Sequence, residues 1–329
     1  MILMKNINLN KVIELIERAK NILILGHVNP DGDCIGAMAA MALGLASINK
    51  NVTVWSEDSV PLKYRFIKCS FEKPQQNIIN NFDLIIVLDT AVQTRVGIPF
   101  DFSIVKQPVL SIDHHVANEN TFSYVYADQS QAATACIVFD ILRKLNIKIT
   151  KPIAEAIYTG IITDTGCFSY SNTDIRTFEI SLELMRVGIN PSEISSIIYN
   201  SFSKEYLKIL AEALSTIELV ADNRGAIMYV SAEMIKKQGL KTFDTEDFVN
   251  YPRSILTVEV ACMLTELPDN KLLRLSLRSK TPDVNVRKLA LKFNGGGHKC
   301  ASGAKINESL FNFLPKLKKE LENFIKNEV

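Results

Sequence analysis

Short apolar runs alternate with helical stretches through the first half of the chain. Four runs rich in Ile, Leu and Val predict buried strands, over residues 21–26, 51–55, 83–88 and 108–112. Longer stretches with apolar residues at helical spacing predict helices over 34–48, 132–145 and 152–162. Strands that alternate with helices are typical of a mostly parallel sheet flanked by helices. The first half therefore predicts an α/β domain.

The second half carries a different pattern, in which predicted strands follow one another in pairs. Turn residues separate the two strands of each pair, as in a hairpin. This pattern predicts a smaller α/β domain after the first one. Its predicted elements are a charged helix over 203–213, strands over 216–220 and 226–230 with a turn at 222–225, strands over 257–264 and 271–279 around 268–270, and a helix over 286–293.

The length of 329 residues also favours two domains, because a single hydrophobic core seldom grows that large. We expect a first domain over 1–195 and a smaller second domain over 214–329. A helical linker over 196–213 is expected to join them. The polar clusters of the first domain follow its strands, at the sheet edge where α/β proteins bind ligands.

Composition narrows the class of protein. An apolar fraction of 47% and a charged fraction of 22% are ordinary for a folded globular chain. The 37 basic and 36 acidic residues give a net charge of +1, which argues against a broad surface for long nucleic acid but allows a small basic pocket. The six cysteines occur singly, which favours a reduced, cytoplasmic setting. We expect no membrane role, since no signal peptide or spanning run is recognised.

The four histidines all lie in polar segments directly after apolar runs, where core histidines are not expected. In the first of these segments, His27, Asp31 and Asp33 connect a predicted strand to a predicted helix. An imidazole and two carboxylates within seven residues can chelate a divalent cation or two neighbouring ones. The alternative is a turn in which Asp33 caps the helix, which leaves the histidine unexplained.

Further polar side chains end other predicted elements. Asp89 follows the third strand, and the triplet Asp113-His114-His115 ends the fourth. Neighbouring residues of a strand point in opposite directions, so the members of the triplet are not expected to share one task. Asp164 follows a helix, where the macrodipole disfavours an acid and a nearby cation would stabilise it.

Imidazole and carboxylate ligands without thiolates suit Mn²⁺, Zn²⁺ or Fe²⁺ better than Ca²⁺. The candidate ligands outnumber the needs of one ion. Two divalent ions bridged by a carboxylate are therefore the simplest arrangement.

These motifs, in this order, resemble the DHH phosphoesterase superfamily, which is named for the triplet Asp113-His114-His115. The resemblance implies that His27 and Asp31 bind one metal ion. Asp33, His114 and Asp164 bind the other in this interpretation, and Asp89 bridges the two. His115 is implied to face the scissile phosphate, and Asp113 to orient the histidines. The family's first motif usually continues Gly-Ser, whereas Ala37 follows Gly36 here; that serine is not a ligand.

The C-terminal segment from Gly295 to Gly303 resembles the signature of the associated DHHA1 substrate-binding domain. Three successive glycines allow several backbone N–H groups to face an anion, with side-chain donors beside them. Arg278 offers a bidentate partner for a terminal phosphate; the alternative is a solvated charge at a strand end. The expected substrate-binding residues are Arg278, Gly295, Gly296, Gly297, His298 and Ser302.

The two-lobed layout is most similar to the NrnA-type group of oligoribonucleases and pAp phosphatases. This resemblance implies an active site in the cleft between two domains. It also implies a Mn²⁺-dependent enzyme that hydrolyses short RNA, linear dinucleotides such as pApA and pGpG, and pAp, by attack of a metal-bridging hydroxide on phosphorus. A homodimer is left open.

Three alternatives stand beside this interpretation. The same catalytic lobe supports a cyclic-dinucleotide phosphodiesterase. It also supports an inorganic pyrophosphatase or polyphosphatase, although the segment from Gly295 to Gly303 argues against the pyrophosphatase branch. The third alternative is a nucleotide sensor or RNA-binding module without catalysis, which is disfavoured because every expected ligand position is filled.

Overall fold

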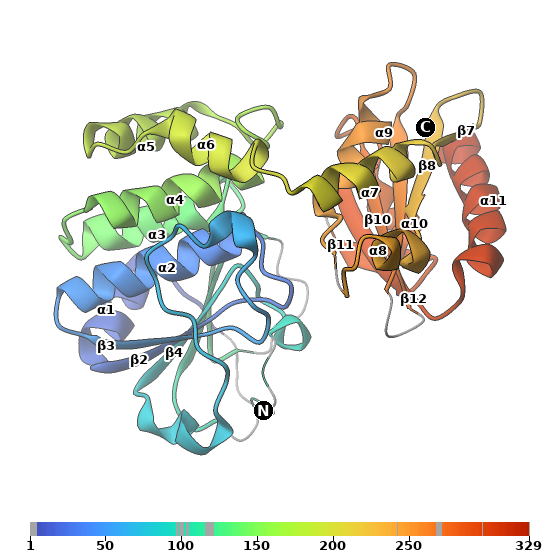
Figure 1. Cartoon of the computed structure of the whole chain (residues 1–329). Helices are drawn as coiled ribbons and strands as arrows, with labels where there is room; N and C mark the ends of the chain where they lie inside the picture. The colour runs from blue at the N-terminus through green and yellow to red at the C-terminus, as the bar shows by residue number, and fades with distance from the viewer. Residues whose placement is uncertain are drawn as a thin grey trace. The chain divides into compact units, whose positions relative to one another are not determined.

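The computed structural model describes residues 5–96, 98, 102, 105–115, 122–241, 243–267, 272–297 and 299–328. The chain divides into two compact units, Met1–Ser201 and Phe202–Val329 (Figure 1). Of the sequence predictions, the turn at 268–270 and the position of His298 lie outside the described residues. No helix within the described ranges is both long and apolar enough to cross a membrane.

The first unit is built on a six-stranded sheet in which every neighbouring pair is parallel. The four predicted strands form its centre and one edge. The three that lie within the sheet have side chains buried on both faces, whereas the edge strand over 51–55 is buried only at Val54 and Trp55. In sheet order the strands are β1 (Lys5–Asn6), β6 (Tyr124–Ala127), β5 (Val109–Asp113), β4 (Leu84–Leu88), β2 (Asn21–Leu25) and β3 (Asn51–Trp55).

The helices that the structure describes in the first unit pack over one face of this sheet, and α5 (Ile175–Arg186) and α6 (Pro191–Tyr199) form an outer layer beyond α4 (Lys151–Asp164) (Figure 1). The opposite face is covered by shorter segments, among them the 3₁₀ helix Gln76–Asn81, which bury Trp55 and Phe82. The helices described in this unit thus flank the sheet on one side only. They are α1 (Leu9–Arg18), α2 (Gly32–Ser47), α3 (Thr134–Lys144), α4 (Lys151–Asp164), α5 (Ile175–Arg186) and α6 (Pro191–Tyr199).

Helix α2 lies at the centre of the helical layer and is buried over most of its length. Its contact with α4 is close because Gly36 has no side chain. A Cβ at Gly36 would lie 2.4 Å from the carbonyl oxygen of Ala156 and 2.9 Å from the amide nitrogen of Gly160. This close approach brings the first turn of α2 toward the end of α4, where Asp164 lies.

The second unit contains another six-stranded sheet, in the order β11-β12-β10-β9-β8-β7. Its strand pairs are antiparallel except for β8 with β9. The strands are β7 (Glu218–Val220), β8 (Gly225–Val230), β9 (Val260–Glu266), β10 (Leu273–Ser279), β11 (Gly296–Gly297) and β12 (Ala301–Ile306).

Helices cover both faces of this second sheet. On one face, α10 (Val286–Leu291) and α11 (Leu310–Glu328) enclose a core of Leu, Val and Phe side chains. On the other lie α7 (Lys204–Leu214), α8 (Ala232–Lys237) and α9 (Asn250–Ser254). Helix α7, which we expected within a linker, buries Ile209, Leu210 and Ala213 against this sheet. The three expected domain ranges stay a prediction.

Candidate metal centre

The loop between β2 and α2 places the first three candidate ligands. Asn29 adopts a left-handed conformation (φ 51°), which turns the chain between His27 and the helix. Asp31 is the N-cap of α2 and accepts a hydrogen bond from the Cys34 N–H at 3.0 Å. The alternative in which Asp33 caps α2 is therefore wrong, because Asp31 already occupies the capping position and Asp33 lies inside the first turn.

Asp33 is only 2% exposed and lies between two helices. Its Oδ2 accepts the Thr134 N–H at 2.6 Å, and its Oδ1 accepts the Ala135 N–H at 2.9 Å. Both donors belong to the N-terminus of α3. The carboxylate is thus held in one orientation by two backbone N–H groups that a helix leaves without an internal partner.

Asp89 follows β4 in a left-handed conformation (φ 63°), and its N–H donates to the carbonyl of Ile112 at 3.0 Å. Its Oδ2 lies 3.2 Å from Nε2 of His27. Its Oδ1 lies 3.9 Å from Nε2 of His114 and accepts the Thr134 hydroxyl at 3.0 Å. The two oxygens of one buried carboxylate therefore face two different histidines.

The remaining candidates complete two overlapping groups. Asp33, His114 and Asp164 each bring a ligand atom within 4.8 Å of the others. Nε2 of His114 lies 3.5 Å from Asp164 Oδ2 and 4.0 Å from Asp33 Oδ2. On the other side of Asp89, Nε2 of His27 lies 3.8 Å from Asp31 Oδ2. All six candidate metal ligands of the first unit are therefore brought together.

Backbone carbonyls fix which ring nitrogen the two histidines present. Nδ1 of His27 lies 2.8 Å from the carbonyl oxygen of Val28, and Nδ1 of His114 lies 3.2 Å from that of Gln131. A carbonyl can only accept, so Nδ1 carries the proton in both rings. Nε2 is then the nitrogen that faces the carboxylates, as a metal ligand requires.

Asp113 and His115 form a separate pair beside this cluster. Asp113 ends β5, is 1% exposed, and its Oδ1 accepts both the backbone N–H of His115 at 3.0 Å and Nδ1–H at 2.6 Å. His115 Nδ1 also lies 3.4 Å from Asp89 Oδ1. The His115 ring is thus oriented by a buried carboxylate, whereas His114 is oriented by a carbonyl.

The electrostatics of the cluster favour a cation. Burial and then the negative charge of Asp89 raise the pKa of Asp33 to about 7. Burial, together with the charges of Asp33 and Asp89, raises the pKa of Asp164 well above its usual range. Burial would also raise the pKa of Asp31, but its hydrogen bond and charge contact with His27 lower it. A divalent cation would relieve the repulsion between these carboxylates, so the donors fit metal ions.

Sequence reasoning missed four residues at this site. Cys34 was counted only among the cysteines that occur singly, yet its sulfur groups with ligand atoms of His27 and Asp89 within 4.8 Å. Thr134 and Gln131 hold Asp89 and His114, and Asn172 donates to the Asp164 carboxylate at 3.4 Å. Only the start of a helix near Thr134 was visible in the sequence.

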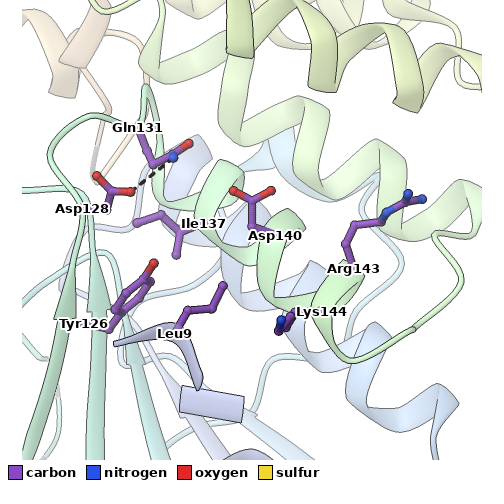
Figure 2. Close-up of a pocket in the computed structure, with 8 residues that line it drawn as sticks. All are labelled: Leu9, Tyr126, Asp128, Gln131, Ile137, Asp140, Arg143 and Lys144. Carbon is purple, nitrogen blue, oxygen red and sulfur yellow. Dashed lines mark hydrogen bonds between the residues drawn. The ribbon is translucent and has the colours of Figure 1, made fainter. Parts of the chain in front are cut away.

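A pocket of about 370 Å³ lies between α1, β6 and α3, and Figure 2 shows the residues that line it. Gln131 lies in its wall and donates through Nε2 to Asp128 at 3.3 Å. The same residue offers its carbonyl to His114, so the pocket wall and the cluster share Gln131. The lining residues are Leu9, Tyr126, Asp128, Gln131, Ile137, Asp140, Arg143 and Lys144.

The expected substrate-binding residues lie in the second unit. Gly296 pairs with Gly303, and Gly297 (φ 133°) pairs with Ser302. A Cβ at Gly295 would lie 2.1 Å from the Gly303 carbonyl oxygen, so close packing against β12 by itself requires glycine there.

Arg278 and Ser302 belong to neighbouring strands but to different faces of the sheet. Ser302 lies opposite Leu277, whose side chain is buried in the core beneath α10 and α11. Arg278 lies opposite Ala301 and follows Leu277 on the strand. Because side chains alternate along a strand, those of Arg278 and Ser302 lie on opposite faces.

Comparisons with known proteins agree with this fold. Residues 21–161 match the N-terminal domain of the DHH family, and residues 222–327 match the DHHA1 domain. The chain is 31% identical over 288 residues to the bifunctional oligoribonuclease and PAP phosphatase NrnA of Thermus thermophilus, covering 87% of this chain and 84% of that protein. It is 27% identical to the probable NrnA of Streptococcus mutans, over 96% and 98% of the two chains.

A solved structure extends the likeness. The crystal structure of an exopolyphosphatase-related protein from Bacteroides fragilis aligns with a TM-score of 0.87 and 29% identity, over 96% of both chains. Fold and site together define a phosphoesterase, a hydrolase of phosphate esters. The chain belongs to the DHH phosphoesterase family, with a C-terminal DHHA1 domain, as the sequence motifs predicted.

Proposed function

We propose that the enzyme hydrolyses short oligoribonucleotides, including linear dinucleotides such as pApA and pGpG, to nucleoside 5′-monophosphates. We further propose that it converts pAp to AMP. The observation that carries the proposal is the buried Asp89 carboxylate, whose Oδ2 faces His27 and whose Oδ1 faces His114, in a chain 31% identical to an oligoribonuclease and PAP phosphatase over 87% of its length.

We assign the ligands to two divalent ions, with Mn²⁺ as the cofactor. His27 and Asp31 hold one ion, and Asp33, His114 and Asp164 hold the other. Asp89 serves both, which its two oxygens support because one faces His27 and the other faces His114. When bound, the cations supply a nucleophile at neutral pH and offset the charge that develops on the phosphate oxygens.

His115 is the residue we assign to the scissile phosphate. Asp113 holds its Nδ1–H, which leaves the opposite edge of the ring as the donor for a phosphate oxygen. Burial would lower the pKa of His115, but its hydrogen bond to Asp113 and the negative charge of Asp89 raise it. A protonated imidazole in this orientation donates to an anionic oxygen and stabilises the charge of the transition state.

The second unit is proposed to bind the anionic end of a short substrate. Arg278 offers a planar donor for phosphate, and the backbone at Gly295, Gly296 and Gly297 offers N–H groups. His298 and Ser302 are assigned to the substrate by the family resemblance alone, since Ser302 is only 5% exposed and its side chain lies on the sheet face opposite Arg278. A net charge of +1 supports short substrates over long nucleic acid.

Two further proposals concern the whole protein. None of the six cysteines, all within the described ranges, forms a disulfide, which supports a cytoplasmic setting. A homodimer is supported by apolar side chains exposed along α5, namely Ile175, Phe178, Leu182 and Met185.

A polyphosphatase is a second candidate function, because the aligned Bacteroides fragilis structure is described as exopolyphosphatase-related. A single panel separates the candidates. It contains pAp, pApA, pGpG, cyclic dinucleotides, a 5-mer RNA, pyrophosphate and polyphosphate, each incubated with Mn²⁺ or with EDTA and followed by product chromatography.

The proposal predicts Mn²⁺-dependent release of nucleoside monophosphates from pApA, pGpG and the short RNA, and of AMP from pAp. If the enzyme instead releases phosphate from polyphosphate and leaves the dinucleotides intact, the proposed function is wrong and the polyphosphatase takes its place. Cleavage of cyclic dinucleotides alone would point to a cyclic-dinucleotide phosphodiesterase. Tight binding of pApA without cleavage in Mn²⁺ would indicate a nucleotide sensor.

A further inference from the structure

The N-terminus of α3 touches the ligand cluster at several points. The Thr134 N–H and the Ala135 N–H donate to the two oxygens of Asp33, and the Thr134 hydroxyl donates to Asp89. Asp33 is assigned to one ion, and Asp89 is assigned to both. One residue, Thr134, therefore contacts carboxylates that belong to both halves of the proposed centre.

The contact with Asp33 also caps the N-terminus of α3. The N-cap residue of this helix is Ala133, whose side chain offers no acceptor for the first N–H groups. The Asp33 carboxylate, 101 residues earlier in the chain than Thr134, takes that role at 2.6 and 2.9 Å. Any displacement of α3 therefore displaces a proposed metal ligand with it.

The hydroxyl contact decides how Asp89 is oriented. Thr134 Oγ1 lies 3.0 Å from Oδ1, and both side chains are almost completely buried. The same Oδ1 faces His114, whereas Oδ2 faces His27 at 3.2 Å. The Thr134 hydroxyl thus holds the Asp89 carboxylate so that Oδ1 points toward His114 and Oδ2 points toward His27.

Neighbouring residues of the same segment also contact His114 directly and Asp164 through one side chain; both are proposed ligands of the ion that Asp33 holds. The Gln131 carbonyl accepts Nδ1–H of His114 at 3.2 Å. Asn172 donates to the Ala132 carbonyl at 2.9 Å and to the Asp164 carboxylate at 3.4 Å. The segment 131–135 is therefore connected to Asp33, Asp89 and His114 directly, and to Asp164 through one side chain.

We propose that Thr134 is a positioning residue for the metal centre, whose hydroxyl fixes the Asp89 carboxylate between the two ion sites while its N–H fixes Asp33. This inference rests on the proposed metal-binding function. It concerns affinity for metal, because a ligand whose partner is removed loses its preset orientation. Loss of such a partner typically weakens metal binding by about 10- to 100-fold.

The test is Mn²⁺ binding by metal-stripped protein, measured by calorimetry and by the electron paramagnetic resonance signal of free Mn²⁺. Thr134→Val keeps the shape of the side chain and removes the hydroxyl, whereas Thr134→Ser restores it. Thr177→Val is a matched control, because the buried Thr177 hydroxyl donates to the Asp174 carboxylate at 2.6 Å, outside the cluster. Thermal unfolding without metal reports the stability of each variant.

The inference predicts that Thr134→Val weakens the binding of at least one Mn²⁺ by about 10-fold or more. Thr134→Ser and Thr177→Val should bind Mn²⁺ as the wild type does. A purely structural role would instead lower the melting temperature of Thr134→Val and leave its Mn²⁺ affinity unchanged, and that result would overturn the inference. If Thr134→Val does not fold, Thr134→Ala is measured in the same way.

The same experiment separates the inference from the proposed function. Wild-type protein that binds no Mn²⁺ at millimolar concentration would overturn the metal centre, and the positioning role with it. Tight binding of two Mn²⁺ by both the wild type and Thr134→Val would retain the metal centre and remove the role of Thr134.

Discussion

At the scale of single residues, the site depends on a few side chains whose surroundings leave them little freedom. Asp89 is the central case. It is 2% exposed, adopts a left-handed backbone conformation, and is in contact with His27, His115 and Thr134. An acid in such a position is costly without a cation, so its position indicates a role in binding metal.

Replacement of Asp89 tests the bridging role. Asp89→Ala, and the isosteric Asp89→Asn, which tolerates the same backbone conformation, should lower kcat by at least about 10³-fold, because one ligand of both ions is lost. Far-ultraviolet circular dichroism should match the wild type. Substantial turnover of pApA by a folded Asp89 variant would remove the bridging assignment.

The raised pKa values of the cluster predict how stability depends on pH. The Asp33 pKa is about 7 in the folded protein against 3.8 as its ordinary value, so the folded state binds this proton more tightly than the unfolded state. Without a bound cation, stability should therefore fall as pH rises from about 4 toward 7. The pKa values of Asp164, His27 and His114 are also raised in the folded protein. Each of these groups should therefore also lower stability as the pH rises from its pKa in the unfolded chain toward its pKa in the folded protein.

Metal should oppose this loss of stability, because a cation replaces the protons. The difference in melting temperature between Mn²⁺-loaded and EDTA-treated protein is expected to be larger at pH 8 than at pH 5.5. Thermal unfolding in matched buffers measures it. A difference that stays constant or shrinks with rising pH would contradict the electrostatic account.

Arg278 is tested through substrate affinity. Arg278→Ala should raise KM for pAp and pApA about 10-fold or more and change kcat less, because a phosphate contact far from the reacting bond is lost. Arg274→Ala is the matched control, since Arg274 lies four residues earlier on the same strand and the same face. An equal KM in the Arg278 and Arg274 variants would show that Arg278 does not bind substrate.

At the scale of helices and strands, the close packing of α2 against α4 positions the candidate ligands at the start of α2 and the end of α4. The sequence predicts both helices and the four strands β2, β3, β4 and β5, because apolar runs of this kind are seldom left exposed to solvent. It does not predict β1 and β6, whose two and four residues are too short for a pattern. Nor does it reveal the contact between Asp33 and Thr134, which joins residues 101 positions apart.

The same limit applies to the site as a whole. The candidate ligands that follow strands, such as His27 and Asp89, could be predicted to lie together because the carboxyl ends of parallel strands meet at one edge. The residues that orient them, Thr134 and Asn172, could not be predicted, because each acts through a hydrogen bond to a distant segment. The opposite orientation of Arg278 and Ser302 depends on strand register, which the sequence leaves open.

Gly36 tests the packing between α2 and α4. Gly36→Ala places a Cβ 2.4 Å from the backbone oxygen of Ala156, so the helices must separate, at a cost of about 1–3 kcal/mol in the free energy of unfolding. Gly44→Ala, on the same helix, meets the tip of the Leu142 side chain at 2.5 Å, which can move. Denaturant unfolding should show a larger loss for Gly36→Ala; an equal or smaller loss would contradict the close approach.

At the scale of the whole molecule, α5 supports the proposed homodimer. Ile175, Phe178, Leu182 and Met185 are 49–79% exposed and are spaced 3, 4 and 3 residues apart, a pattern that an antiparallel copy of the helix can match. The four side chains expose on the order of 500 Å² in each copy, so a pair would bury roughly 1,000 Å², near the lower limit for a specific interface.

Sedimentation measures this association directly. The wild type should form dimers at tens of micromolar, and Leu182→Glu should remain monomeric because a charge enters the apolar stripe. Leu256→Glu is the matched control, since Leu256 is 91% exposed in the second unit. A monomeric wild type, or a dimer that persists in folded Leu182→Glu, would contradict the α5 interface.

The central claim is that two ions held around Asp89 enable the chain to hydrolyse short oligoribonucleotides. The most direct test titrates Mn²⁺ into metal-stripped protein and follows both metal binding and the formation of AMP from pApA. The account predicts two Mn²⁺ per chain, with hydrolysis appearing as the sites fill. Full-rate hydrolysis in EDTA, or no AMP from pApA at saturating Mn²⁺, would contradict it.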